Sequence, residues 1–122
     1  MDIELFEPED IPQPPAHVKI ERLAATPYPD GWRVRLGVDV TPFQERPNLE
    51  ITVQAVDGRP VTPISLSVIE TMHHSMEFTV HIRGVTNPAG DYIAHAALYY
   101  GSLDQPQAHA ETPFSIVEPN RP

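Results

Sequence analysis

The sequence contains no cysteine, and this absence removes several kinds of chemistry. None of the 122 residues is a cysteine, so the chain can form no disulfide framework, no thiolate metal site and no cysteine nucleophile. Long apolar runs are also missing, because no stretch approaches the roughly 20 apolar residues that cross a membrane. The amino terminus lacks the basic start and the apolar run of a secretion signal. We therefore expect a cytoplasmic protein, since cysteine-free chains suit a reducing compartment.

Basic residues are scarce. The chain has 8 Lys and Arg against 17 Asp and Glu, which gives a formal net charge of -9. Repulsion from phosphate groups disfavours nucleic acid and anionic membranes as partners. Five of the acidic residues lie in the first ten positions, between Asp2 and Asp10. Much of the acidity therefore belongs to an N-terminal segment, and the remainder of the chain is only mildly acidic.

Glycine is also uncommon, with 6 residues against 15 prolines. Proline interrupts helices and central strands, so this composition favours many short segments. Apolar residues recur at every second position in seven such segments, and no set recurs at helical spacing over a useful length. Pro113 places the last segment at the edge of a sheet, because proline cannot donate to a strand ladder. The expected strands span residues 17–25, 32–41, 49–55, 64–71, 76–83, 92–100 and 108–117.

The length corresponds to one domain with a single modest core. Residues 1–16 are acidic and proline-rich, which predicts a tail that is either disordered or docked as an extra strand. Ile3, Leu5 and Phe6 are the apolar residues on which such docking would depend. Residues 17–118 are expected to form the domain, and residues 119–122 a short C-terminal tail.

A proline and glycine turn precedes the sixth segment, in the run Pro88-Ala89-Gly90-Asp91-Tyr92. With seven short strands separated by turn signals, this run resembles the immunoglobulin-like β-sandwich, closest to the fibronectin type III arrangement. The resemblance covers about four-fifths of the chain. It implies that strands A, B and E face a second sheet of strands C′, C, F and G. It also implies a tyrosine corner, in which the Tyr92 hydroxyl bonds to the upstream backbone.

Two positions depart from the antibody pattern within that family. Ala94 stands where antibody domains have a cysteine, and Trp32 lies at the start of the second strand rather than in the third. These departures disfavour the antibody subfamily and leave cysteine-free relatives open. The resemblance implies binding, adhesion or scaffolding roles but assigns no single function.

Histidines are the residues that would most readily hold a metal. His73 and His74 are adjacent in an expected loop, with Glu70 and Glu77 on either side. Their spacing matches no zinc signature, so we expect a solvated loop with no bound metal or cofactor. His81 and His95 should lie on the outer faces of different sheets.

Catalytic motifs are lacking. No G-x-S-x-G elbow, phosphate-binding loop or dinucleotide fingerprint occurs in the chain, so we expect no enzymatic activity. The leading hypothesis is a non-catalytic protein-interaction or scaffold module. The alternative is an accessory domain that binds a carbohydrate or peptide through loop residues near Trp32 or His73. In that case Tyr28 and Trp32 would form an aromatic platform, whereas the simpler interpretation places Trp32 at the bottom of the core.

The expected topology gives the two outer faces different characters. The face of strands A, B and E should carry charges of both signs, whereas the face of strands C, F and G should be almost uncharged. An apolar patch on such a face is typical of an interaction site, with Ile93 and Tyr99 near its centre. The partner would be another protein or a second copy, unless the tail or a neighbouring loop covers the face. The candidate binding residues are Val56, Ile93, His95, Ala97, Tyr99 and Val117.

Overall fold

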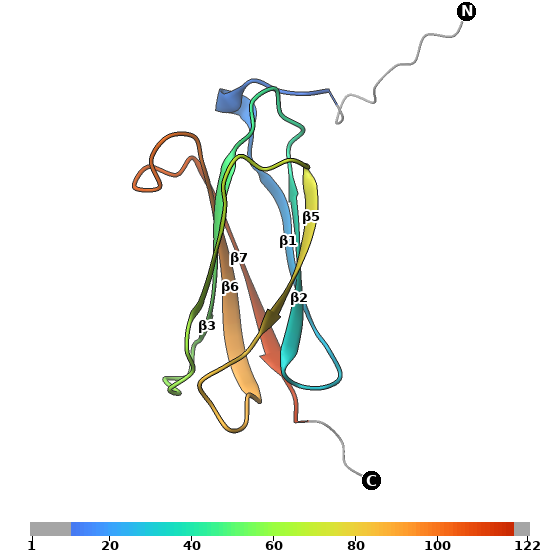
Figure 1. The fold of residues 1–122 in the computed structure, drawn as a ribbon, viewed down its shortest axis with the longest axis vertical. Coiled ribbons are helices and arrows are strands. Elements are labelled where there is room, and N and C mark those ends of the chain that lie inside the picture. Colours follow the sequence, from blue (N-terminus) through green and yellow to red (C-terminus); the bar gives the residue numbers. More distant parts are fainter. Residues whose placement is uncertain (1–10, 119–122) are drawn as a thin grey trace, which may run out of the picture.

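The chain folds as an all-β sandwich of seven strands in two antiparallel sheets (Figure 1). The computed structural model describes residues 11–118. One sheet has the strand order β1-β2-β5 and the other the order β4-β3-β6-β7. This division of the strands between the sheets is the one that the resemblance implied. The strands are β1 (Ile20–Pro27), β2 (Arg33–Val40), β3 (Asn48–Ala55), β4 (Ile64–Val68), β5 (Ser75–His81), β6 (Gly90–Tyr99) and β7 (Ala108–Ile116).

The alternation of apolar residues is clearest in β2. In β2, Val34, Leu36, Val38 and Val40 are fully buried between the sheets, because a two-residue period places them on one face. The central strand β6 supplies the facing layer from the other sheet. All seven predicted strands are present, and their boundaries differ from the expected ones by three residues or fewer.

The first strand departs from the expected simple alternation. A β-bulge lies between Ile20 and Arg22, where the pairing with β2 shifts by one residue. Val18 is buried before this point, whereas Leu23 faces the core after it. The bulge therefore moves Arg22 to the outer face, where it lies 3.7 Å from the Asp39 carboxylate. Glu21 lies within the bulge and is exposed.

The two long sides of the sandwich differ. Strand β1 packs against β7 across one side, although they belong to different sheets. Pro113 lies inside β7, and β7 is an edge strand, as its proline predicted. The opposite side is bordered by the edge strands β4 and β5. An isolated bridge between Thr62 and Arg83 connects the segments next to them.

Tyr92 begins the buried part of β6 and forms the predicted tyrosine corner. Its hydroxyl donates a hydrogen bond to the Pro88 carbonyl oxygen, at 2.5 Å, and the residue is almost completely buried. Its ring stacks on Phe114 with 5.3 Å between centroids. The Arg59 guanidinium lies 4.9 Å from the same ring and donates to the Ala89 carbonyl oxygen at 2.6 Å. The turn before β6 is thus stabilised by both the Tyr92 hydroxyl and the Arg59 guanidinium.

Gly90 is required at this turn for two reasons. Its φ of 144° is a conformation that side chains disfavour, and a Cβ atom there would lie 2.4 Å from the Arg59 guanidinium. Arg59 also donates through Nε to the Asp57 carboxylate at 2.6 Å. The β3–β4 connection is in this way tied to the turn that precedes β6.

Residues 11–18 cross the end of the sandwich at which β6 ends and β7 begins. The Gln13 amide donates to the Pro42 carbonyl oxygen at 2.8 Å, and the Gln44 amide donates to the Gln13 carbonyl oxygen at 2.9 Å. The side-chain amide of Gln107 donates to the carbonyl oxygens of Pro15 and Val18. Part of the expected tail is therefore packed on the domain. Residues 1–10, with Ile3, Leu5 and Phe6, and residues 119–122 lie outside the described part of the chain.

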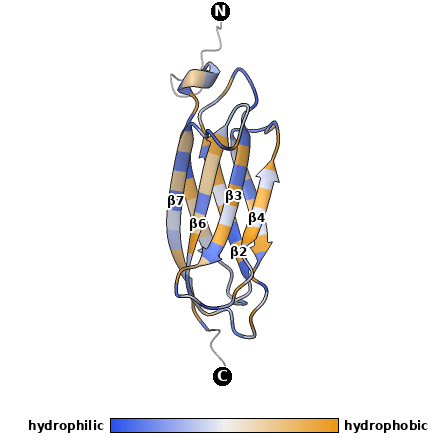
Figure 2. Ribbon diagram, turned by 90° about the vertical axis from the view of Figure 1, so that its left-hand side faces the viewer, coloured by the Kyte–Doolittle hydropathy of each residue, from blue (hydrophilic) through white to orange (hydrophobic). Residues whose placement is uncertain are grey.

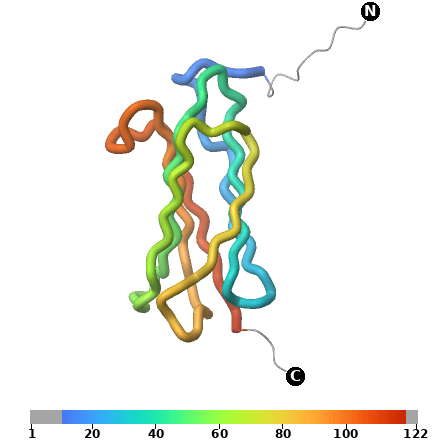
Figure 3. Tube along the Cα trace, in the orientation of Figure 1, coloured from blue at the N-terminus to red at the C-terminus, as the bar shows by residue number. Residues whose placement is uncertain are grey.

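The chain enters and leaves the sandwich at opposite ends of its long axis (Figure 3). Among residues 11–118, no helix has the length and apolar character needed to cross a membrane.

The β1–β2 turn is organised by Asp30. Its Oδ1 atom accepts hydrogen bonds from the backbone amides of Trp32, at 2.9 Å, and Arg33, at 3.1 Å. Its Oδ2 atom accepts from Arg33 Nε at 2.6 Å. These donors stabilise the charged carboxylate, so the amide of Trp32 first and the Arg33 guanidinium second lower the pKa of Asp30 from 3.8 to about 2.

We predict that Tyr92→Phe lowers the free energy of unfolding by about 1 to 2 kcal/mol, because it leaves the buried Pro88 carbonyl oxygen without its donor. Denaturant unfolding measures the change. Tyr100→Phe is the matched control, since that hydroxyl bonds to the Glu45 carbonyl oxygen near the surface. An unchanged midpoint for Tyr92→Phe would show that the tyrosine only packs.

We predict that the Asp30 turn loses its stabilising contribution as the pH falls from about 4 to about 2. The folded pKa lies below the unfolded value, so this contribution is complete above the unfolded pKa and disappears as the carboxylate is protonated. Asp30→Asn should therefore lower the unfolding midpoint at pH 6 and have a smaller effect at pH 2.5. Asp104→Asn, in the exposed β6–β7 connection, is the control. An equal loss at both pH values would contradict the prediction.

Candidate interaction surface

The outer face of the sheet β4-β3-β6-β7 is the surface on which the candidate binding residues were expected. Figure 2 shows this sheet facing the viewer, with hydrophilic and hydrophobic residues alternating along its strands. The strand register aligns residues in rows across it. One row contains Thr52, His95 and Glu111, and the next contains Gln54, Ile93 and Pro113.

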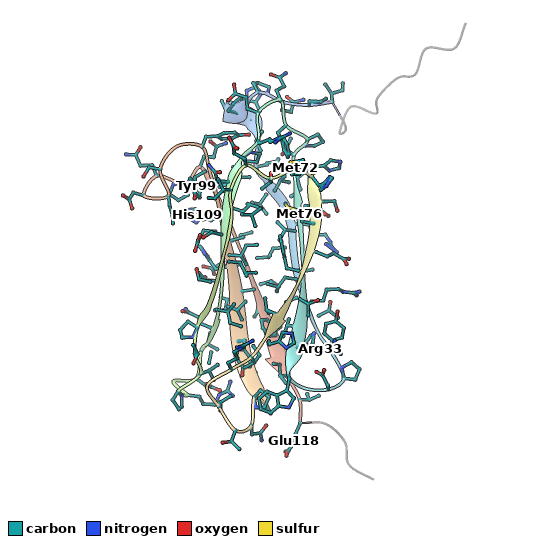
Figure 4. All side chains as sticks on the ribbon, in the orientation of Figure 1. Arg33, Met72, Met76, Tyr99, His109 and Glu118 are labelled. Atoms are coloured by element: carbon teal, nitrogen blue, oxygen red, sulfur yellow. The ribbon has the colours of Figure 1, made fainter. Side chains whose placement is uncertain are left out.

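One end of this face is covered within the molecule. Ala97 is only 5% exposed and Tyr99 only 8% exposed, although the alternation of β6 directs both outward. The β6–β7 connection projects from this side, and Figure 4 shows Tyr99 next to it. The Gln107 amide donates to the Leu98 carbonyl oxygen at 2.8 Å and anchors that connection. Tyr99 therefore offers little surface to a partner, in contrast to the expected position at the centre of an exposed patch.

The middle of the face is polar. The Glu50 carboxylate accepts hydrogen bonds from the hydroxyls of Ser65 and Ser67 on β4, and these bonds lower the pKa of Glu50. On the neighbouring strands, the rings of His95 and His109 lie 5.4 Å apart, tilted by 44°.

Carboxylates correct the expectation of a nearly uncharged face. Glu50, Asp91 and Glu111 all occupy outward positions on it, and Glu111 pairs directly with His95. Ser115 was expected to face outward, and residues two apart on a strand share a face. The sequence could therefore have placed Glu111, four residues before Ser115, on the same outer face.

The other end of the face has an apolar depression of about 430 Å³. Ile93 and Pro113 are paired across β6 and β7 and line it, together with Tyr92 and Phe114. Val56 borders the depression and is 56% exposed. The outward position of Pro113 was missed from the sequence, where this residue was used only to place β7 at the sheet edge.

Next to it, Asp91 and Ser115 add a polar border to the depression. The Ser115 hydroxyl donates to the Asp91 carboxylate at 2.6 Å. The accessible part of the expected patch is therefore Val56 with Ile93 and the half-buried His95, while Ala97 and Tyr99 are buried.

Val117 belongs to a different depression. It is 78% exposed and lines a hollow with Trp32, Pro88 and Glu118 at the end of the sandwich. Trp32 is 42% exposed, so it does not close the core as the simpler interpretation expected. The backbone amide of Trp32 donates a hydrogen bond to the Asp30 carboxylate, which holds Trp32 in the turn and not in the core.

Tyr28 does not line the hollow that contains Trp32. The Arg33 guanidinium lies over the Tyr28 ring, 4.3 Å from its centroid. The Tyr28 hydroxyl lies 3.4 Å from the Thr79 hydroxyl of β5. The expected two-ring platform is therefore reduced to Trp32 alone.

The outer face of the sheet β1-β2-β5 carries charges of both signs, as expected. Asp39 lies next to the Arg22 guanidinium and accepts a hydrogen bond from the Ser75 hydroxyl at 2.7 Å. Gly37 lies beneath Arg22, and a Cβ atom there would come within 2.9 Å of that side chain. Water solvates such a surface well, and interface centres tend to exclude charge.

The histidines are distributed over separate places. His73 and His74 are exposed in the β4–β5 connection. His81 and His95 lie on the outer faces of different sheets, as predicted. Across residues 11–118, no three His, Asp or Glu side chains converge in a way that could hold a metal ion.

A scan against protein-family models and a search of curated proteins find no match to this chain.

Proposed function

We propose that the chain is a non-catalytic protein-interaction module with an immunoglobulin-like sandwich of the fibronectin type III arrangement. Its partner is another protein or a second copy of the chain, and nucleic acid and membrane are not partners. The strand order β1-β2-β5 against β4-β3-β6-β7 and the Tyr92 corner support the type of sandwich. The absence of cysteine supports a cytoplasmic setting.

One observation carries the proposal, namely the apolar depression on the outer face of β3, β6 and β7. Val56, Ile93 and Pro113 supply adjacent apolar surface there, and Val56 is more than half exposed. The rest of the face is polar and acidic. An apolar centre with a polar rim is the usual composition of a protein interface. The rim carboxylates of Asp91 and Glu111 favour a partner with basic residues around its own apolar centre.

The hydroxyl groups on this face support a non-catalytic role. Ser65 and Ser67 donate to Glu50, and Ser115 donates to Asp91. A nucleophilic serine instead donates its proton to a base such as histidine. Since these serines are bonded to carboxylates, they contribute to the cross-strand hydrogen bonding of the sheet.

Light scattering coupled to gel filtration tests the second copy as partner. We expect a concentration-dependent dimer that Val56→Glu with Ile93→Glu dissociates into folded monomers, because two buried, unpaired carboxylates would oppose association. The matched control is Thr26→Glu with Thr79→Glu, two exposed positions on the outer face of the other sheet.

Two results would contradict this form of the proposal. A wild-type chain that stays monomeric at high concentration would reject self-association. A variant that unfolds at clearly lower denaturant concentration would show that Val56 and Ile93 are covered within the monomer.

The alternative is an accessory domain that binds a carbohydrate or peptide near Trp32 or His73. The exposure of Trp32, in a hollow that also contains Asn87 and Glu118, favours the Trp32 end. A glycan and peptide array should then give a signal that Trp32→Ala abolishes, because the indole face provides the stacking surface. His73→Ala is the control, and a signal that survives Trp32→Ala would reject this site.

A further inference from the structure

Two histidines lie side by side in the polar middle of the outer face of β4-β3-β6-β7. His95 is on β6 and His109 is near the start of β7, and their rings are 5.4 Å apart and tilted by 44°. The strand register pairs His95 with Glu111. It pairs His109 with Ala97, so the two rings meet diagonally across the strands. His109 is exposed and His95 half-buried, and Figure 4 shows His109 on this outer side of the sheet. The pairing of β6 with β7 therefore brings together two imidazoles that the sequence alone did not associate.

The separation of the rings suits a shared metal ion. Imidazole is a preferred ligand of zinc, which binds ring nitrogens at about 2.0–2.1 Å in a tetrahedral arrangement. Two imidazoles on one tetrahedral zinc therefore have their ring centroids about 5 Å apart. The observed separation of 5.4 Å is close to that value. Small rotations of the two side chains suffice to direct one nitrogen of each ring to the same ion.

A carboxylate stands next to the pair. Glu111 is directly opposite His95 on β7 and is exposed. Histidines that bind a metal usually donate their other ring N–H to a carboxylate or carbonyl oxygen, which fixes the orientation of the ring. Glu50 lies on the same face, but its carboxylate accepts hydrogen bonds from Ser65 and Ser67 on β4. Glu111 is therefore the carboxylate that is positioned to support His95.

One copy of the chain supplies only half of a zinc site. Structural zinc sites have four protein ligands, whereas no three His, Asp or Glu side chains converge within residues 11–118. The site is completed when two such faces meet around a two-fold axis, because a symmetric contact uses the same patch of both copies. Two copies then contribute two histidines each, which makes four imidazole ligands.

The charge of this sheet also favours a cation between the copies. None of the strands β3, β4, β6 and β7 contains a lysine or an arginine. Their outward carboxylates are Glu50, Asp91 and Glu111. Two such faces brought together repel each other, because like charges oppose association. A divalent cation between them offsets that repulsion.

We propose that His95 and His109 bind a zinc ion that is shared with the same two residues of a second copy. The ion completes its tetrahedral coordination with four imidazoles, and Glu111 accepts the second ring N–H of His95. The adjacent apolar depression, lined by Ile93 and Pro113, adds its surface to the contact. The inference rests on the second-copy form of the proposed function and adds the ion that stabilises it.

Light scattering coupled to gel filtration of the untagged chain, in EDTA and in excess zinc, tests this proposal. Zinc should lower the dissociation constant of the dimer about tenfold or more, because the complete site exists only where two copies meet. Titration calorimetry should give one zinc per two chains. His95→Gln/His109→Gln should lose both responses. The matched control is His73→Gln/His74→Gln, the exposed pair in the β4–β5 connection, which should keep them. Magnesium should have no effect, since it prefers oxygen ligands.

The outcomes separate this inference from the proposed function. One zinc per chain, or a zinc response that His95→Gln/His109→Gln leaves unchanged, would overturn the shared site. A dimer in EDTA that zinc does not strengthen would reject the zinc site and keep the proposed function. A dimer that forms only in zinc and requires both histidines would support the zinc site and show that the apolar depression is not sufficient alone. A chain that stays monomeric in both solutions would reject both ideas.

Discussion

The buried hydrogen bond from the Tyr92 hydroxyl to the Pro88 carbonyl oxygen fixes the start of β6, the strand on which the larger sheet depends. β6 pairs with β3 on one edge and β7 on the other, so its position sets the register of both. Arg59 reinforces this point, because its guanidinium contacts the Tyr92 ring and donates to the turn carbonyls. One short turn therefore couples three strands and the β3–β4 connection.

The register of β6 also decides what the outer face presents. Its inward residues fill the core, and the alternate residues meet Glu50 from β3 and His109 from β7. The result is a face that is covered at one end, polar in the middle and apolar at the other end. Tyr92 and Phe114, whose stacked rings help to anchor the strand, also line the depression at the apolar end.

The two sides of the sandwich show how a cysteine-free domain closes its core. On one side β1 reaches β7, and Pro27 and Pro113 in these edge strands limit further pairing. On the other side, an isolated bridge between Thr62 and Arg83 is the backbone pairing found among residues 11–118. Gly84 permits that contact, because its φ of 81° and its approach to the Thr62 backbone leave no room for a side chain. The half-buried Ile64 and Leu66 lie at this less complete border.

The sequence by itself determined the seven strands, the edge position of β7 and the Tyr92 corner. Each of these depends on residues close together in the chain, whose two-residue alternation or turn chemistry needs no knowledge of distant partners. The bulge at Glu21, the burial of Tyr99, the exposure of Trp32 and the bonding of Glu50 to two serines were decided only by the tertiary structure. In each case the cause is either a segment distant in sequence or a local backbone shift. A two-residue alternation predicts neither of these. Strand alternation states which residues share a face, whereas the neighbouring elements decide whether that face is open to solvent.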